Sequence, residues 1–265
     1  MKKHIIAFIL ILSFLLAGCG AEKSAEPEEV KYYITERITT FSDGSSIRDT
    51  YEYDSKWNMV LGITYHDGEE TSRIQYENTK YSTKMTILQD GEEFTMEFRI
   101  TYDDQGNQIR TERYVDGELS IVTECTFDEQ GNRLIQTDTQ VRRNDTSKLE
   151  MEYDENGNLL KMTLDGAHNT VYTYDEKGRI LKKEEFPAEG LGSYCEYSYS
   201  SDGLTKTCLI YQSNGFSAGK TIETYDTFGN MLKSESYLGG KLSSTTVNTY
   251  VGTDRTISSG IESEG

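Results

Sequence analysis

The residues that most often carry out enzyme chemistry are scarce in this chain, and their spacing does not suit catalysis. Only three histidines occur, and His4 lies in an apolar leader, while His66 and His168 each stand beside a predicted turn. None has the neighbours of a catalytic triad or of a paired metal site. We therefore expect no catalytic residue, no metal site and no cofactor.

Acidic residues are abundant, but they recur at equivalent places along the chain. The segment Asp154-Glu155-Asn156-Gly157-Asn158 offers oxygen ligands for calcium, yet it lacks the further ligands and the bidentate glutamate of an EF-hand loop. A glycosidase needs a specific pair of carboxylates, and no unit carries an obvious extra pair. We interpret the acids as turn residues, which makes a glycan-acting hydrolase the weakest functional alternative.

Three cysteines besides Cys19 occur in the chain. Folding a hairpin about Ser201-Asp202 places Cys195 and Cys208 opposite each other, or within one residue of that register. Because disulfides persist outside the cytoplasm, Cys195–Cys208 is a candidate disulfide, and two small buried thiols are the alternative. Cys125 lies two residues before an aromatic position, in an apolar column, and is interpreted as a core residue.

Tyrosine is the main aromatic residue, with 19 copies against nine phenylalanines. Tyrosines at one repeated position are interpreted as core residues. Tyrosines elsewhere on a sheet suit stacking on sugars or packing against a protein partner, since aromatic residues are enriched at interfaces. The candidate ligand-binding residues are Tyr114, Tyr194, Tyr211 and Tyr237.

The elements that position these residues are repeated. An aromatic residue and an acid, two variable residues and Gly-Asn form a motif, as in Tyr102-Asp103-Asp104-Gln105-Gly106-Asn107. Seven residues after most of these aromatics comes an aliphatic residue, and most units also hold an Asp-Gly, Asn-Gly or Gly-Gly pair, which is a strong hairpin signal. The lead aromatics, 21 to 26 residues apart, are Tyr53, Tyr76, Tyr102, Phe127, Tyr153, Tyr174, Tyr199, Tyr225 and Tyr250.

This pattern predicts an all-β domain over residues 32–252. Each unit contributes two strands of about seven to nine residues, so we expect an antiparallel meander of hairpins with about sixteen strands. An open twisted sheet rarely exceeds about ten strands without curling, which favours a coiled or spiral sheet or an open barrel-like shell over a flat single layer. Whether the aromatic and aliphatic columns share a face stays open, because one residue of register slip reverses a face.

The units at Tyr153-Asp154-Glu155-Asn156-Gly157-Asn158 and at Tyr174-Asp175-Glu176-Lys177-Gly178-Arg179 resemble the YD repeats of the Rhs and teneurin families. The resemblance covers roughly residues 50–250 and implies hairpins arranged in a spiral sheet. The cargo-enclosing role of large Rhs proteins is not expected to carry over to about nine units. MORN-like repeats are a weaker alternative.

The beginning of the chain is typical of an export signal. Lys2 and Lys3 precede an apolar run of about twelve residues, which is too short to span a bilayer that needs about twenty. Leu16-Ala17-Gly18-Cys19 resembles the lipobox of bacterial lipoproteins, which implies a lipid on Cys19. We expect a signal peptide over 1–18, the lipidated cysteine with a flexible tether over 19–31, and a disordered tail over 253–265.

The charge of the chain limits its partners. The net charge is −18, and removal of residues 1–18, which hold two lysines and no acids, leaves −18 − 2 = −20. Such a chain repels phosphate backbones, so no nucleic acid is expected. The leading hypothesis is a non-enzymatic binding or scaffold lipoprotein outside the cytoplasm, with membrane attachment through Cys19 and an envelope protein or glycan as partner. A purely structural spacer or surface-coat element is the alternative.

Overall fold

The computed structural model of this protein describes residues 31–252 and 256–258, which form an all-β meander of antiparallel strands. The first nine strands are β1 (Tyr32–Phe41), β2 (Ser46–Tyr53), β3 (Met59–His66), β4 (Glu69–Asn78), β5 (Ser82–Gln89), β6 (Glu92–Tyr102), β7 (Gln108–Val115), β8 (Glu118–Phe127) and β9 (Arg133–Gln140). The others are β10 (Asp145–Tyr153), β11 (Leu159–Leu164), β12 (His168–Tyr174), β13 (Ile180–Phe186), β14 (Ser193–Tyr199), β15 (Thr205–Gln212), β16 (Ser217–Tyr225), β17 (Met231–Leu238), β18 (Lys241–Gly252) and β19 (Thr256–Ser258).

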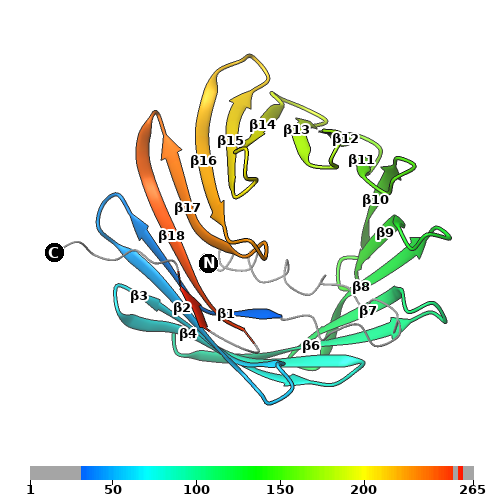
Figure 1. Ribbon diagram of the computed structural model, residues 1–265. Helices are drawn as coiled ribbons and strands as arrows, with labels where there is room; N and C mark the ends of the chain where they lie inside the picture. The colour runs from blue at the N-terminus through cyan, green and yellow to red at the C-terminus, as the bar shows by residue number, and fades with distance from the viewer. Residues whose placement is uncertain (1–30, 253–255, 259–265) are drawn as a thin grey trace, which may run out of the picture.

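The sheet closes into a barrel (Figure 1). Strand β1 pairs with β2 on one side and with β18 on the other, in a register that runs from Tyr32–Gly252 to Phe41–Ser244. The expected coiled or spiral sheet is therefore wrong. Closure satisfies the backbone groups that an open sheet leaves unpaired at its two edges, and it joins strands from opposite ends of the domain, which no local sequence pattern encodes.

The barrel contains eighteen strands rather than the sixteen expected, because the weak units at both ends also supply complete strands. Strand lengths run from six residues in β11 to twelve in β18 among the barrel strands. The short strand β19 pairs with β18 outside this ring. It falls within the segment expected to be a disordered tail, and the rest of that segment lies outside the described residues.

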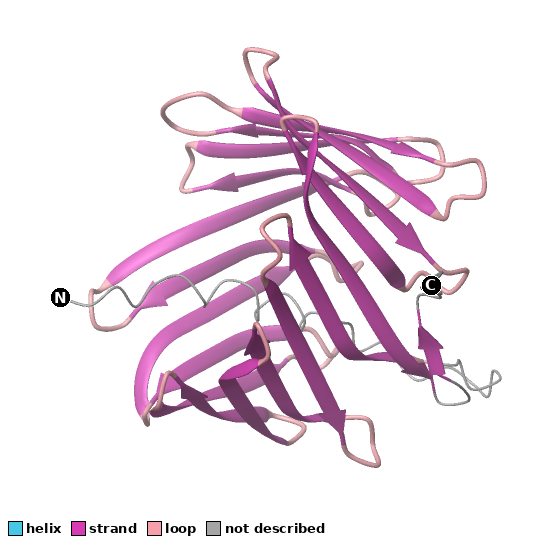
Figure 2. Cartoon of the chain, turned by 90° about the vertical axis from the view of Figure 1, so that its left-hand side faces the viewer, coloured by secondary structure: helices cyan, strands magenta, loops and turns pink. Residues whose placement is uncertain are grey.

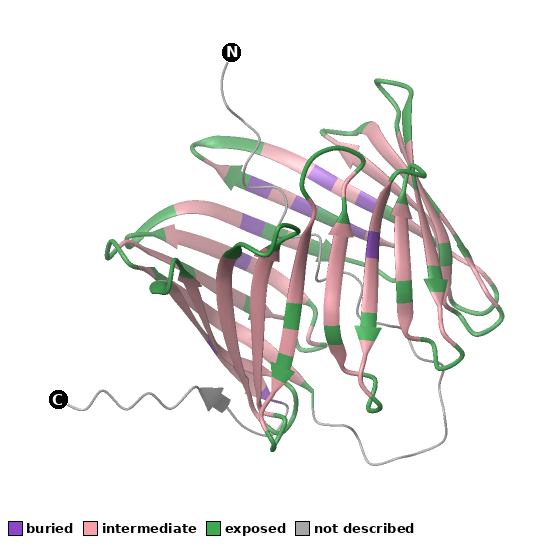
Figure 3. Ribbon diagram, turned by 90° about the horizontal axis from the view of Figure 1, so that it is seen from above, coloured by how far each residue is buried: buried purple, intermediate pink, exposed green. Residues whose placement is uncertain are grey.

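Successive residues of each strand alternate between two faces, and one face is clearly more buried. Met85 on β5 is 3% exposed and pairs with Met96 on β6, which is 7% exposed; Ile74, Ile87 and Phe98 complete this small core. On a closed wall, side chains of the concave side converge and those of the convex side diverge, so the buried set faces inward. Few residues are fully buried elsewhere (Figure 3).

Most of the inner wall is polar. A barrel of sixteen to eighteen strands is too wide for its own side chains to fill, so its inner wall can carry charged groups beside water. Lys183 and Glu185 form an ion pair of 2.6 Å on this face, and Lys206 and Glu223 form another of 2.8 Å. The low hydrophobic content of the chain, 35%, follows from this architecture.

The two kinds of turn lie at opposite rims of the barrel (Figure 2). The motif turns, such as residues 103–107, form the motif rim, and the Asp-Gly turns, such as Asp67-Gly68, form the Asp-Gly rim. Asp67 and Gly68 have φ angles of 49° and 88°, as a type I′ hairpin requires at both central residues. Because β1 begins and β18 ends at the motif rim, both ends of the barrel chain lie there.

The two repeated positions of each unit, the lead aromatic and the aliphatic residue seven positions later, have separate structural roles. The lead tyrosines lie on the inner face, and five of them bond to the preceding hairpin. For example, the Tyr153 hydroxyl donates to the Arg133 carbonyl at 2.9 Å, and Tyr174 donates to the Leu159 carbonyl at 2.7 Å. In six units the residue seven positions after the lead aromatic is the extra residue of a β-bulge. These bulge residues are Val60, Ile109, Leu134, Leu160, Leu181 and Leu232.

The predicted signal peptide, Cys19 and all of the tether except Lys31 lie outside the described residues. Within residues 31–252 and 256–258, no helix has the length and apolar character needed to cross a membrane.

Candidate binding surfaces

The motif aspartates are occupied by their own turns. In Asp154, Oδ1 accepts hydrogen bonds from the backbone N–H groups of Asn156 at 2.9 Å and Asn158 at 2.8 Å, and Oδ2 accepts one from the Asn158 side chain at 2.8 Å. These bonds, the one from the Asn158 side chain foremost, lower the pKa of Asp154. Equivalent bonds recur at Asp54, Asp103, Asp128 and Asp226. Their carboxylates therefore act as turn caps.

The described part of the chain holds no cluster of three or more histidine, cysteine or acidic residues arranged for a metal ion. His66 stands at the end of β3, 3.9 Å from an Asp67 carboxylate oxygen, and His168 opens β12. The two histidines are therefore on different hairpins and form no common site.

The cysteines lie on the inner face as free thiols. Cys195 pairs with Ile210 and Cys208 pairs with Tyr197, so the two cysteines are diagonal neighbours. The expected register places the two cysteines directly opposite or one residue apart, and it is wrong. The hairpin is centred one residue later than Ser201-Asp202, so Cys208 lies two residues from the position opposite Cys195. Burial raises the pKa of the Cys208 thiol to about 12, which keeps it protonated at neutral pH. The Cys195–Cys208 disulfide stays a prediction.

Cys125 is half-buried on β8, where it pairs with Gln136. Burial raises the pKa of its thiol, and the nearby Arg133 guanidinium opposes this effect. The burial of Cys125 and its nearness to Arg133 are those of a thiol packed in the inner wall.

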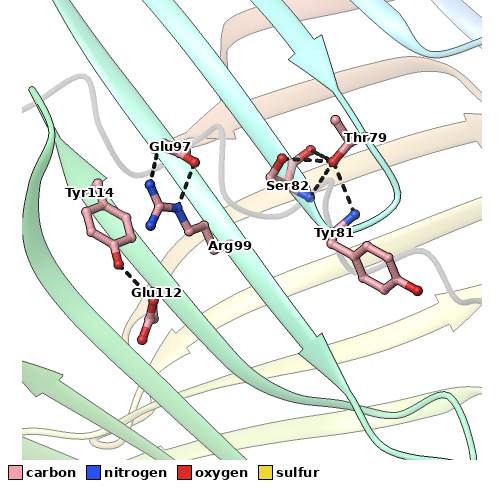
Figure 4. A network of polar contacts seen from close by, with 7 residues as sticks. All are labelled: Thr79, Tyr81, Ser82, Glu97, Arg99, Glu112 and Tyr114. Carbon is pink, nitrogen blue, oxygen red and sulfur yellow. Dashed lines mark hydrogen bonds and ion pairs between the residues drawn. The ribbon is translucent and has the colours of Figure 1, made fainter.

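Tyr114 lies on the outer face among charged residues (Figure 4). Its hydroxyl donates to Glu112 at 2.8 Å, and the Arg99 guanidinium carbon is 4.2 Å from its ring centroid. Arg99 is itself held by Glu97, at 2.8 Å. One face of the Tyr114 ring is therefore covered by a cation from the neighbouring strand.

Two of the other three candidate tyrosines, Tyr194 and Tyr237, also lie beside a lysine, and Tyr211 stacks on Tyr194. Tyr194 and Tyr211 are directly paired and stack with 4.9 Å between ring centroids, and the Lys182 Nζ lies 4.8 Å from the Tyr194 ring. Lys220 covers Tyr237 at 4.5 Å. All four tyrosines lie on the outer face close to the Asp-Gly rim, so the structure brings them to one level of the barrel.

Tyr65 belongs to the same level and was not among the predicted residues. It precedes the Asp67-Gly68 turn by two residues, as Tyr114 precedes Asp116-Gly117 and Tyr237 precedes Gly239-Gly240. Arg48 covers its ring at 5.5 Å. The constant offset from the turn is the sequence signal that identifies it.

Apolar side chains gather near three of these tyrosines. We define the rim patch as Tyr194, Tyr211 and Tyr237 with the exposed residues Phe186, Leu191, Phe216, Leu238 and Leu242. Leu191, Phe216 and Leu238 are 66–67% exposed and come from three successive turns of the Asp-Gly rim. The Ser213 N–H donates to the Gly192 carbonyl at 2.8 Å, which ties two of these turns together.

The rest of the outer face carries ion pairs across and along the strands. Arg110 contacts Glu112 at 3.0 Å and Glu124 at 2.5 Å, and Lys182 contacts Glu184 at 2.8 Å. Exposed pairs of this kind add little stability, about 0–1 kcal/mol each. They give the outer wall a charged, hydrated surface.

A polar pocket of about 300 Å³ lies on the inner wall between β6 and β10. Its lining consists of two rows of residues that pair directly across neighbouring strands, each called a rung here, together with Gln136. One rung is Phe98, Arg113, Ile121, Gln140 and Asp145, and the next is Thr111, Thr123, Asp138 and Ser147. Sequence analysis missed this pocket because its residues come from five strands and share no motif.

Hydrogen bonds organise one side of the pocket. Asp138 accepts from the Thr123 hydroxyl at 2.5 Å and from the Gln136 amide at 2.8 Å. Gln136 in turn accepts from Arg133 at 2.9 Å. Burial lowers the pKa of Arg113, against the attraction of Asp138.

No family model and no curated protein matches this chain. Among solved structures, the TcdB2-TccC3 chain without its hypervariable C-terminal region is similar over 81% of this chain and 15% of that chain, at 13% identity and a TM-score of 0.39. A porin-like protein from Bacteroides uniformis is similar over 82% of this chain and 96% of that chain, at 10% identity and a TM-score of 0.43. The chain spans only a small part of the TcdB2-TccC3 chain, and likenesses this distant carry no functional argument.

Proposed function

We propose that this chain is a lipid-anchored, non-enzymatic binding protein outside the cytoplasm, which holds a protein partner on the rim patch. The observation that carries this proposal is the gathering of exposed aromatic and aliphatic side chains at the rim opposite the two ends of the barrel chain. Exposed apolar patches mark interaction sites, and tyrosine and phenylalanine are enriched in protein interfaces.

The proposed lipid anchor would join the barrel at its motif rim. Lys31, the first described residue, follows Cys19 by twelve residues, and an extended chain spans at most about 3.6 Å per residue, or about 43 Å. A lipid on Cys19 keeps the motif rim within that distance of the membrane. The Asp-Gly rim and its patch lie at the end of the barrel opposite the tether, where a partner can reach them.

The charged outer wall supports a barrel that stands in water. Charged residues that face lipid cost about 2–4 kcal/mol each for Arg or Lys near the bilayer midplane. Outward charged groups occur on strands far apart in the barrel, such as Arg48 on β2, Arg99 on β6 and Lys182 on β13. Anchoring through a lipid chain, rather than through the wall, is the arrangement that these charges favour.

A protein partner fits the rim patch better than a glycan does. Sugars stack on open ring faces, but the Tyr194 ring lies between Tyr211 and Lys182, and Lys220 covers Tyr237. Ring edges, hydroxyl groups and the exposed Leu191, Phe216 and Leu238 remain accessible. Such a surface suits packing against apolar side chains.

The test is crosslinking capture from native cell envelopes with the full-length chain. The rim variant carries Leu191→Ser, Phe216→Ser and Leu238→Ser, and the control variant carries Leu134→Ser, Leu160→Ser and Leu181→Ser at the motif rim. We expect one protein at near-equal amounts with the wild type and the control, and its loss with the rim variant. The anchor is checked by Cys19→Ala, which should move the chain from the membrane fraction to the soluble fraction.

Equal capture by the rim variant and the wild type would contradict the docking surface. Loss of capture when wall polysaccharide competes would assign the rim to a glycan instead. A Cys19→Ala chain that stays in the membrane fraction would contradict the anchor.

A further inference from the structure

The inner-wall pocket contains a cationic group with an unused donor. The Nε of Arg113 is buried and has no hydrogen-bond partner among the described residues. Its direct neighbours on the adjacent strands are Phe98, which is 6% exposed, and Ile121. A buried donor without a partner costs about 1–3 kcal/mol, so this arrangement calls for an acceptor that the chain itself does not supply.

Asp138 does not serve as that acceptor, because its carboxylate makes no hydrogen bond with the Arg113 Nε. Its two carboxylate oxygens are engaged by Thr123 and by Gln136, and Gln136 is held by Arg133. Asp138 therefore compensates the charge of Arg113 from a fixed position. It leaves the guanidinium donors available for a ligand.

The far side of the pocket offers further unused polar groups. Within the described part of the chain, the side chains of Gln140, Asp145 and Ser147 make no hydrogen bond, and all three line the pocket. Gln140 pairs with Ile121, and Asp145 pairs with Gln140, so the polar groups continue the rung that begins at Arg113. Amide and hydroxyl groups can both donate to and accept from sugar hydroxyl groups, and the carboxylate of Asp145 can accept from them.

Charge favours a neutral ligand. The pocket lining holds one arginine and two aspartates, and the whole chain has a net charge of −18. Because Asp138 already balances Arg113, an anionic ligand would meet net repulsion from Asp145 and from the surrounding field. A cationic ligand would leave the Arg113 donors unused.

The dimensions favour an extended ligand. Arg113 and Asp145 lie three strands apart on one rung, or about 14 Å at the usual spacing of about 4.8 Å. The pocket volume of about 300 Å³ is at the lower end of known ligand pockets. One sugar ring is too short for this span, whereas two or three linked rings cover it.

We infer that this pocket binds a neutral saccharide of two or three sugar units, with Arg113 donating to ring or hydroxyl oxygens at one end and Gln140, Asp145 and Ser147 bonding to hydroxyls at the other. Ile121 lies between these polar groups and gives the sugar an apolar surface to pack against. This site is separate from the rim patch and does not depend on the proposed protein partner.

The test is calorimetric titration of the full-length chain in detergent with cellobiose, maltotriose and N,N′-diacetylchitobiose. A disaccharide that contains glucuronic acid is the acidic comparison. We expect saturable binding of at least one neutral probe, with one site per chain. Arg113→Gln should weaken that binding about 10- to 100-fold, as loss of hydrogen bonds from a charged group implies.

The matched control is Arg110→Gln, which removes the same charge from the same strand on the outer face, where Arg110 pairs with Glu112 and Glu124. It should leave saccharide binding unchanged. Nuclear magnetic resonance of ¹⁵N-labelled arginine gives an independent readout, because the Nε–H signal of Arg113 should shift when the sugar is added. Thermal unfolding checks that both variants are folded.

Three results would overturn the inference. The first is no binding of any neutral probe up to its solubility. The second is equal binding by Arg113→Gln and wild type, with an unmoved Arg113 signal. The third is tighter binding of the acidic disaccharide than of every neutral probe, which would assign the pocket to an anion. Each of these is independent of protein capture at the rim.

Discussion

At the scale of single residues, tyrosine serves two purposes in this barrel, and its position decides which. Five inner tyrosines of the lead column donate their hydroxyl to a backbone carbonyl of the preceding hairpin, as Tyr53 does to Ile34 at 2.8 Å. Outer tyrosines near the Asp-Gly rim instead pack beside cations, as Tyr237 does beside Lys220. The first group is structural and the second belongs to a surface.

The inner tyrosines predict a loss of stability at high pH. Burial raises the pKa of Tyr51 and of Tyr53 from 10.0 to about 12. Since the folded state holds these protons more tightly than the unfolded state, their contribution is fully present below pH 10 and is lost as the pH rises towards 12. The free energy of unfolding, measured with urea between pH 8 and 12, should fall in this window.

Tyr53→Phe provides the comparison for this prediction. The variant lacks one of the titrating tyrosines, so its free energy of unfolding should depend less steeply on pH above 10. Identical slopes for the wild type and the variant would show that Tyr53 does not titrate with folding.

At the scale of elements, the aspartates of the two kinds of turn are used differently: one kind forms hydrogen bonds to a neighbouring hairpin, and the other forms them within its own turn. In three Asp-Gly turns, the aspartate side chain accepts from the backbone of the preceding hairpin, as Asp165 does from the Lys148 N–H at 2.6 Å. In the motif turns, the aspartate closes its own loop. Neighbouring motif turns also touch: a Cβ on Gly157 would lie 3.6 Å from the Asn132 Oδ1. Contacts between neighbouring turns therefore add to the strand pairing at both rims.

Asp154→Ala tests the motif turn. The change removes three hydrogen bonds at once, so the melting temperature should fall by several degrees, whereas Glu155→Ala in the same turn should change it little. Because hydrogen bonds lower the pKa of Asp154, its contribution is present above about pH 4 and is lost as the pH falls through the folded-state pKa. The alanine variant should therefore lose less stability in acid than the wild type does.

At the scale of the whole molecule, closure depends on the seam between β1 and β18. Asn248 on β18 is 1% exposed and is the largest fully buried side chain. Its amide donates to the Met231 carbonyl at 2.8 Å, and its oxygen accepts from the Arg37 Nε at 3.3 Å. One polar side chain thus links β17, β18 and β1.

Asn248→Ala should loosen this seam, because it removes two buried hydrogen bonds at a cost of about 1–3 kcal/mol. Hydrogen exchange should quicken in β1 and β18 more than in β8 and β9, on the other side of the barrel. Asn169→Ala, at a more exposed position of β12, is the control. Uniform acceleration in all strands would contradict a local opening at the seam.

The amino-acid sequence alone determined the repeat, the antiparallel meander and both turn types, since these follow from contacts within about 25 residues. Asp-Gly pairs in type I′ turns require a positive φ angle at the aspartate, and the structure has one at Asp67, Asp90, Asp116 and Asp165. Tyr114, Tyr194, Tyr211 and Tyr237 could be separated from the lead column by position alone.

Only the tertiary structure decided the closure, the strand number and the inner pocket. Closure pairs β1 with β18, and that pairing depends on the twist summed over every intervening strand. The bulges at Leu134, Leu160 and Leu181 shift each register by one residue, which a strict alternation of faces cannot anticipate. Arg113, Gln140 and Asp145 line one pocket because three strand registers add up across the wall, so their alignment is a property of the assembled sheet.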